Sequence, residues 1–222
     1  MLAEFTVRYP GLATGVECDI SSDSSVAAAV ETFAQECQML GVLVNNAASW
    51  KPAGELASMP SAVWERDLSI LLGGPQRVTS GLNDHFDRGA AIVTIASVHG
   101  LAASPFWGTY DIAKAGLIQW ARVIAAELGP RSITSNVVSP GIILDRAYQN
   151  AELEGFHTAA GLIPRLGSPN DVARAVAFLA DVRNGFITGA NLVVDGGMTS
   201  RLQLTAQEVH SPWPSTSRGD VE

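Results

Sequence analysis

Short apolar runs alternate along the chain with longer segments of helical periodicity. The apolar runs are bounded by polar or glycine-containing segments, which predicts that they form buried strands. They cover residues 13–18, 42–45, 91–96, 134–138 and 191–194. Runs that are apolar at successive positions are typical of parallel sheets covered by helices on both faces.

The longer segments predict helices at residues 26–38, 61–86, 106–128 and 170–180, with a break at 73–75 in the second of them. Ser24 and Asn170 are candidate N-caps, and Gly129 followed by Pro130 is a stop signal. This alternation of strands and helices predicts an α/β fold with three αβα layers around a parallel sheet. We expect one domain over residues 1–200 and a flexible tail over 201–222.

Composition narrows the possible partners. The chain has 222 residues, of which 47% are hydrophobic, and a formal net charge of −8. This charge disfavours nucleic acids and anionic membranes, so small molecules and proteins remain as partners. Its two cysteines, Cys18 and Cys37, are too few for a disulfide framework and have no metal-ligand spacing. No apolar run approaches the roughly 20 residues that span a bilayer. We therefore expect a cytoplasmic protein without a metal site.

Tyr110 and Lys114 are four residues apart on a predicted helix, so they lie on one face of it. An ammonium beside a phenol favours the phenolate and would lower the tyrosine pKa from about 10 toward neutrality, where the side chain becomes a usable acid or base. The spacing alone is weak, because such a pair is more often an amphipathic contact with a solvated ammonium.

Ser97 stands at the end of the predicted strand 91–96, where parallel sheets bind their ligands. With Ser97, Tyr110 and Lys114 in this order, the sequence resembles the short-chain dehydrogenase/reductase family. Three further segments carry the resemblance: residues 44–48 (VNNAA), 136–141 (NVVSPG) and 187–197 (ITGANLVVDGG). The resemblance extends over about residues 15–197.

The resemblance implies that Tyr110 donates or accepts the proton, that Ser97 orients the carbonyl or alcohol, and that Lys114 lowers the tyrosine pKa and holds the nicotinamide ribose. It implies NAD or NADP as cofactor. The residues it places around the cofactor are Asp19 and Ile20 near the adenine, Asn46 near the adenosine ribose, and Pro140, Gly141 and Ile143 near the nicotinamide. Gly141 and Asn45 have an alternative reading as residues required by local turns.

The family opens with a strand and a Gly-rich turn that holds the cofactor pyrophosphate, and this sequence contains neither. The resemblance therefore implies a Rossmann-like sheet, doubly wound, that misses its first two strands. The predicted strand 13–18 then either shifts to pair with residues 42–44, or an apolar edge is left exposed for a partner. Without the turn, the alternative is that no cofactor binds.

Two positions depart from the family pattern at the active site. Leu71 stands where the family usually has the asparagine of a proton relay, and Asp145 stands where it commonly has a threonine near the nicotinamide. His99, two residues after Ser97, suggests a base for a nucleophilic serine, although no nucleophile-elbow motif surrounds Ser97. The aromatic residues Trp50, Trp107 and Tyr148 indicate either an apolar or aromatic substrate or loop packing.

Three functions remain open. The first is an oxidoreductase that transfers hydride between a nicotinamide cofactor and a ketone or secondary alcohol. The second is a cofactor-free acid–base catalyst that uses Tyr110 and Ser97 for dehydration, cyclisation or isomerisation. The third is a non-catalytic subunit that pairs with a complete family member. The resemblance also implies a homo-oligomer built through the two long helices.

Overall fold

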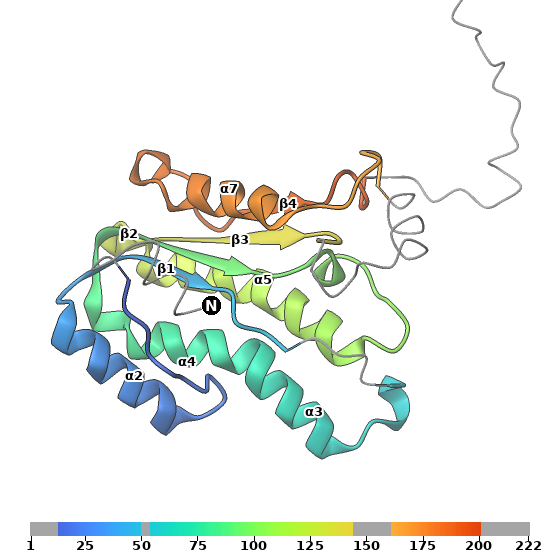
Figure 1. The fold of residues 1–222 in the computed structure, drawn as a ribbon, viewed down its shortest axis with the longest axis horizontal. Helices are drawn as coiled ribbons and strands as arrows, with labels where there is room; N and C mark the ends of the chain where they lie inside the picture. Colours follow the sequence, from blue (N-terminus) through green and yellow to red (C-terminus); the bar gives the residue numbers. More distant parts are fainter. Residues whose placement is uncertain (1–12, 50–53, 144–160, 201–222) are drawn as a thin grey trace, which may run out of the picture.

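In the described part of the chain, a four-stranded parallel sheet forms the centre (Figure 1). The computed structural model describes residues 13–49, 54–143 and 161–200. The strands lie in the order β1-β2-β3-β4, and each pairs in parallel with its neighbour. They are β1 (Leu40–Asn45), β2 (Phe86–Ile95), β3 (Thr134–Pro140) and β4 (Asn191–Val194). The predicted α/β class is therefore correct, and four of the five predicted strands are present.

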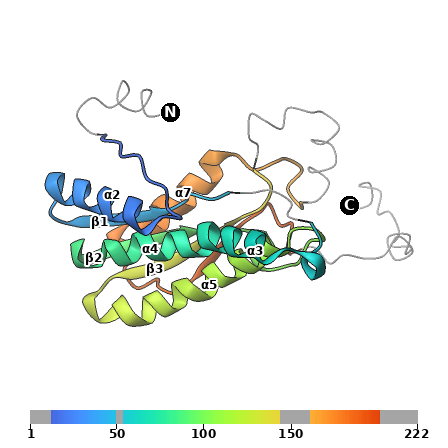
Figure 2. The ribbon, with the colours of Figure 1, turned by 90° about the horizontal axis from the view of Figure 1, so that it is seen from below.

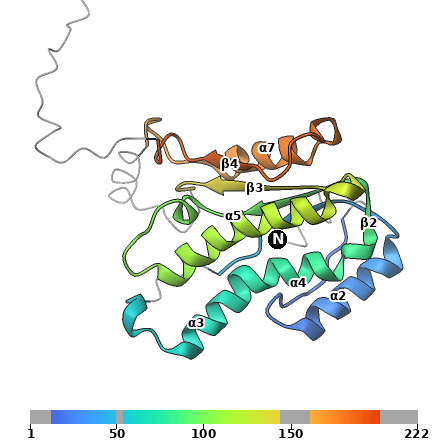
Figure 3. The same ribbon diagram turned by 180° about the vertical axis from the view of Figure 1, so that it is seen from behind.

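Helices cover both faces of the sheet, which gives the expected three-layer, doubly wound arrangement. They are α2 (Asp23–Glu36), α3 (Ser61–Leu68), α4 (Gly74–Gly81), α5 (Gly108–Leu128) and α7 (Pro169–Ala180). Seen from below, α2, α4 with α3, and α5 lie side by side across one face (Figure 2). The α7 helix packs against β2, β3 and β4 on the other face (Figure 3). Short 3₁₀ turns occur at Leu56–Ser58, Asn83–His85, Val98–Gly100, Gly129–Arg131 and Val182–Asn184.

The expected break at residues 73–75 is instead a wide helical turn. A π-helical segment, Ser69–Gly73, joins α3 to α4, so the chain stays helical through Gly74 and Pro75. Proline removes an N–H from the helical ladder, and a π-turn is one of the ways in which a helix accommodates such a loss. The Arg77 guanidinium donates to the carbonyl oxygen of Ser69 at 2.9 Å and so supplies that oxygen with a donor.

Helix caps lie slightly upstream of the predicted positions. Ser22, not Ser24, caps α2 by accepting from the Ser25 N–H. Ser168, not Asn170, caps α7 and forms a capping box with Asp171. The stop at Gly129 is confirmed, since α5 ends at the preceding residue.

Three apolar clusters hold the layers together. Two lie on the side of α4 and α5, and the third joins α7 to the sheet. The third cluster contains Val93 and Val138 from the central strands together with Ala175 and Leu179 from α7. Every residue of β3 is buried, as expected for a strand covered on both faces.

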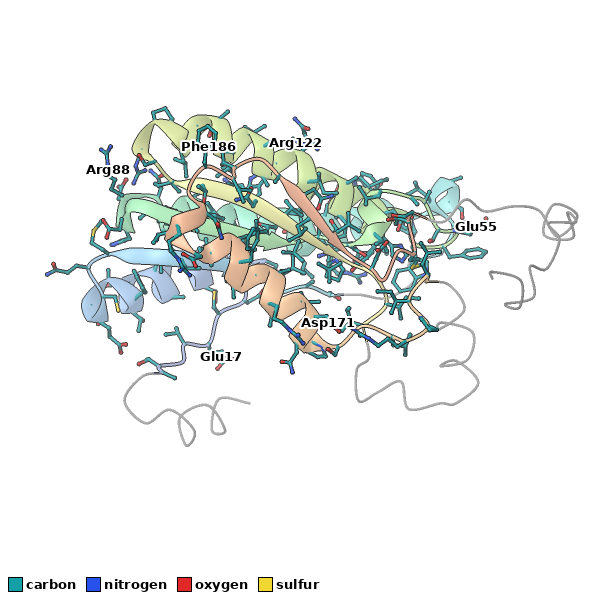
Figure 4. All side chains as sticks on the ribbon, turned by 90° about the horizontal axis from the view of Figure 1, so that it is seen from above. Glu17, Glu55, Arg88, Arg122, Asp171 and Phe186 are labelled. Carbon is teal, nitrogen blue, oxygen red and sulfur yellow. The ribbon has the colours of Figure 1, made fainter. Side chains whose placement is uncertain are left out.

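The predicted strand 13–18 is wrong. Residues 13–19 are irregular, and β1 pairs only with β2 among the described residues. A strand needs a partner for its N–H and C=O groups, and this segment instead lies near the helices: Val16 and Cys18 line a hollow together with Val26 of α2 and Val78 of α4. The shift that would pair this segment with residues 42–44 does not occur, so among the described residues β1 is one of the two edge strands of the sheet. Seen from above, α7 crosses the sheet while the segment carrying Glu17 lies on the β1 side (Figure 4).

No helix in the described part of the chain is long and apolar enough to cross a membrane. The same residues contain no group of three His, Cys, Asp or Glu side chains placed to hold a metal ion. The tail expected at 201–222 lies outside the described residues.

Candidate active site

The predicted catalytic residues meet at the carboxyl edge of the sheet. Ser97 follows the end of β2, while Tyr110 and Lys114 lie in the first turns of α5. Parallel strands end at the same edge, and α5 begins there because it crosses back toward the start of β3. The contact between α5 and the short turn Val98–Gly100 brings the three side chains together.

The Ser97 hydroxyl is nearly buried and lies between two partners. Its oxygen accepts a hydrogen bond from the backbone N–H of His99 at 3.2 Å, and its side chain hydrogen-bonds to the Tyr110 phenol. A hydroxyl that accepts from an amide keeps its own proton for donation. Ser97 is therefore a ready donor toward an oxygen placed beside Tyr110.

Burial raises the pKa of Tyr110 above its usual value of 10, and the charge of Asp111 also raises it, while the hydrogen bond to Ser97 lowers it. The net shift is therefore upward, opposite to the direction that the sequence analysis expected from the spacing of Tyr110 and Lys114. The Lys114 ammonium lies over the phenol ring, 5.4 Å from its centroid, and its nitrogen is bonded elsewhere. The phenol is thus held in its neutral, proton-carrying form.

Lys114 is 3% exposed and donates from Nζ to the carbonyl oxygen of Ile95 at 2.8 Å. Burial lowers the pKa of Lys114 to about 8, because a desolvated ammonium loses its hydration. The other donors of this ammonium have no partner among the described side chains, so they are available to a ligand.

Two aromatic rings pack against Tyr110. The sequence analysis did not identify Asp111, the residue that holds this cluster in place. The Asp111 carboxylate is buried, lies 2.6 Å from Nδ1 of His99, and accepts from the Ser104 N–H at 2.7 Å. The rings of His99 and Trp107 both pack against that of Tyr110. Asp111 and His99 are twelve residues apart with no helical or strand period between them, so only the fold brings them together.

The nucleophilic reading of Ser97 is not supported by this geometry. The His99 ring nitrogen Nδ1 faces Asp111, and the hydrogen bond that reaches the Ser97 hydroxyl comes from the His99 backbone. A base for a serine nucleophile must hydrogen-bond the hydroxyl through its ring.

The residues expected around the nicotinamide lie at the ends of β3 and β4. Gly141 donates its N–H to the carbonyl oxygen of Val194 at 3.0 Å, and a Cβ at this glycine would lie 2.8 Å from the Cβ of Asp195. Gly141 is therefore required by packing, whatever else it does. Pro140 ends β3 in a buried position, and Ile143 forms a bridge with Gly167. Asp145 lies outside the described residues.

The residues expected around the adenosine lie next to β1. Ile20 and Asn46 line an apolar hollow at the edge of the sheet. The Asp19 carboxylate accepts from the hydroxyl and N–H of Ser21, and these hydrogen bonds lower its pKa. Asn45, by contrast, is buried and donates to Thr79 at 3.2 Å, which makes it a structural residue.

The described residues fit the nicotinamide half of a dinucleotide better than its pyrophosphate. Lys114 offers free donors at the sheet edge, whereas α2 carries Asp23 in its first turn and follows Asp19. Carboxylates at a helix start repel a pyrophosphate. Leu71 is buried, so the position expected for the relay is apolar, and Trp50 and Tyr148 lie outside the described residues.

Comparison with known proteins agrees with this arrangement. The family described as enoyl-(acyl carrier protein) reductase matches residues 2–199. An uncharacterised oxidoreductase of Schizosaccharomyces pombe is 35% identical over 213 residues, covering 90% of this chain and 80% of the relative. The 3-oxoacyl-[acyl-carrier-protein] reductase FabG of Chlamydia trachomatis is 33% identical over 189 residues, covering 81% of this chain and 74% of the relative. The solved structure of ElxO with NADP bound superposes with a TM-score of 0.79 at 27% identity, covering 89% of this chain and 86% of that one. The chain therefore belongs to the short-chain dehydrogenase/reductase family.

Proposed function

We propose that this protein is an oxidoreductase that transfers a hydride between NAD or NADP and a ketone or secondary alcohol. The observation that carries the proposal is the Tyr110 phenol, kept neutral by burial and hydrogen-bonded to Ser97, with the Lys114 ammonium over its ring. The reductase activity of the FabG relative and the NADP held by ElxO support it.

In the direction of reduction, a substrate carbonyl oxygen placed between Ser97 and Tyr110 accepts a hydrogen bond from each hydroxyl. These two donors stabilise the negative charge that develops on this oxygen. The nicotinamide, when bound, supplies the hydride to the carbonyl carbon. Tyr110 then gives its phenolic proton to the oxygen, and in the direction of oxidation it takes the proton back.

Lys114 has two tasks in this proposal. Its free donors bind the ribose hydroxyls of the cofactor, and its positive charge near the Tyr110 ring stabilises the phenolate left by proton transfer. Pro140, Gly141 and Ile143 would flank the nicotinamide, and Ile20 and Asn46 the adenosine. The substrate we expect is apolar or aromatic, because the Trp107 ring packs against Tyr110 and the adjacent Phe106 is exposed.

The proposal is tested by calorimetric titration of the chain with NADH and with NADPH. Lys114→Met should weaken binding about tenfold or more, the loss expected for hydrogen bonds from a charged donor. Tyr110→Phe should bind as the original chain does and should lose reduction of a ketone panel. A chain shown to be folded by circular dichroism that binds neither cofactor at millimolar concentration would overturn the proposal.

A cofactor-free acid–base reaction is the second candidate. It is favoured by the acidic start of α2 and by the apolar Leu71. Turnover of a β-hydroxy carbonyl compound that depends on Tyr110 and needs no added nucleotide would support this candidate.

We further propose that the chain forms a homo-oligomer through α4 and α5, or that a complete family member binds there. A mainly apolar groove lies between the continuous helical stretch of α3 and α4 and the helix α5, and it is lined by Leu68, Leu72, Gly73, Gln76, Gly116, Gln119, Trp120 and Val123. Val123→Arg should dissociate the assembly in light scattering, while Val182→Arg, at an exposed valine elsewhere, should not. A chain that is monomeric without the substitution would refute self-association.

A further inference from the structure

Asp111 holds the loop between β2 and α5 at two points. One carboxylate oxygen, Oδ1, lies 2.6 Å from Nδ1 of His99, and the other, Oδ2, accepts from the backbone N–H of Ser104 at 2.7 Å. Asp111 itself is 8% exposed. A carboxylate withdrawn from water is stable only with such partners, so this loop and the first turn of α5 are fastened to each other.

The contact with Asp111 determines which ring nitrogen of a neutral His99 carries the proton. A carboxylate only accepts hydrogen bonds, so a neutral His99 must carry its proton on Nδ1. This places the imidazole ring at a set angle: it stands edge-on to Tyr110, with ring centroids 5.4 Å apart and an interplanar angle of 82°. Edge-to-face contacts of this kind orient the rings that form them.

The second contact fixes a strained turn. Trp107 donates its N–H to the carbonyl oxygen of Ser104, and Phe106, the third residue of this turn, has a φ of 69°. With Pro105 in second place this is the pattern of a type II turn, whose third position normally needs glycine. A phenylalanine there is strained and stays only if the surroundings hold it. The turn delivers Trp107, whose ring centroid lies 5.7 Å from that of Tyr110.

Asp111 therefore holds both rings that pack against Tyr110, the His99 ring directly through Nδ1 and the Trp107 ring through the turn that begins at Ser104. We propose that Asp111 is a positioning residue, which acts through His99 and the turn at residues 104–107 to hold the Tyr110 phenol against Ser97. This inference rests on the proposed function only in taking Tyr110 as the residue that transfers the proton. Two other charged groups lie close to this cluster, the Lys114 ammonium over the Tyr110 ring and the Asp67 carboxylate bonded to Thr109.

The experiment compares Asp111→Asn with Asp67→Asn. Asp67 also binds the first turn of α5, by accepting from the Thr109 hydroxyl at 3.0 Å, but the structure gives it no contact with the three rings. The readout is the ionisation of Tyr110, followed by NMR in the chain labelled at tyrosine Cζ; its signal is assigned with Tyr110→Phe, since the sequence has only three tyrosines. Neither cofactor nor substrate is needed.

Asp111→Asn should lower the pKa of Tyr110 by about one unit or more, the size of shift that a lost charge and lost burial produce. Asp67→Asn should leave it unchanged. His99→Phe separates charge from position, because it retains the Asp111 carboxylate and a ring but loses the Nδ1 bond. A lower Tyr110 pKa in His99→Phe supports positioning, and an unchanged pKa overturns it in favour of a purely electrostatic effect.

Turnover gives a second readout where the oxidoreductase proposal holds. Asp111→Asn should then lower kcat and shift its pH profile, with little change in the KM for the cofactor. If the chain binds no cofactor, the oxidoreductase proposal fails and the Tyr110 titration still decides the role of Asp111. An Asp111→Asn protein whose Tyr110 titrates like that of the unsubstituted chain would overturn the inference.

Discussion

The ammonium of Lys114 is bonded to the carbonyl oxygen of Ile95, 2.8 Å away, and not to the phenol of Tyr110. This bond ties the first turns of α5 to the last residue of β2, two residues before Ser97. The buried ammonium thus connects the elements that carry the other two site residues. It is also costly, because a charge is withdrawn from water with a single neutral acceptor.

This cost makes the stability of the chain depend on pH. The pKa of Lys114 is about 8 in the folded chain, against an ordinary value of 10.5 that applies to the unfolded chain. Between these values the folded chain binds fewer protons than the unfolded one, so the contribution of Lys114 to stability rises with pH and levels off above 10.5. Below pH 8 the lysine is charged in both states and the full cost remains.

Lys114→Met should therefore stabilise the chain at pH 7. The free energy of unfolding should increase by on the order of 2 kcal/mol, after about 1 kcal/mol is deducted for the lost hydrogen bond to Ile95. This increase should shrink as the pH rises toward 10. Urea unfolding at a series of pH values measures it, with Arg122→Met on the exposed side of the same helix as control. An equal effect of Lys114→Met at pH 7 and pH 10 would contradict a lowered pKa of Lys114 as the cause.

The sequence was sufficient for those elements whose signals are local. The apolar runs located four strands, and the spacing of Tyr110 and Lys114 placed both on one helix face. The prediction of a strand at residues 13–18 was wrong because a strand forms only where a neighbouring strand pairs with its backbone. The composition of this segment suits a sheet, but no second strand among the described residues takes up its hydrogen bonds.

The electrostatics of the site lay beyond sequence reasoning for a related reason. Proximity of Lys114 to Tyr110 followed from spacing, but the direction of the tyrosine pKa depends on burial and on Asp111, which only the folded chain supplies. The contact of Asp111 with His99 joins a helix to a loop and has no periodic signature.

The cap of α7 can be tested by two matched substitutions. The Ser168 hydroxyl accepts from the N–H of Asp171, whose carboxylate accepts in return from Ser168. Ser168→Ala should lower the free energy of unfolding by about 1 kcal/mol, as is usual for a lost N-cap. Asn170→Ala, inside the helix, should change it little. An equal loss in the two variants in thermal unfolding would point to the predicted cap at Asn170 instead.

Gly141→Ala should destabilise the chain at the end of β3. The new Cβ would lie 2.9 Å from the backbone Cα of Asp195, and backbone cannot move aside as a flexible side chain does. We expect a loss of about 1 to 3 kcal/mol in chemical unfolding, typical of overpacking. Gly129→Ala is the control, because nothing lies within 4 Å of its Cβ position. A Gly141→Ala chain as stable as this control would show that β3 and β4 can separate at their ends.

The edge strand β1 is the most exposed apolar part of the sheet. Val42 is 39% exposed and Val44 42%, and β1 pairs only with β2 in the described parts of the chain. Free N–H and C=O groups beside exposed valines are a template for pairing with another chain. Val42→Lys should therefore reduce self-association, measured by light scattering as a function of protein concentration. It should leave the free energy of unfolding nearly unchanged, because the side chain is already in contact with water.

Val182→Lys is the control. This substitution changes an exposed valine outside the sheet, has the same charge change, and should leave association through β1 intact. If both variants reduce association equally, net charge is the cause and the edge of β1 is not.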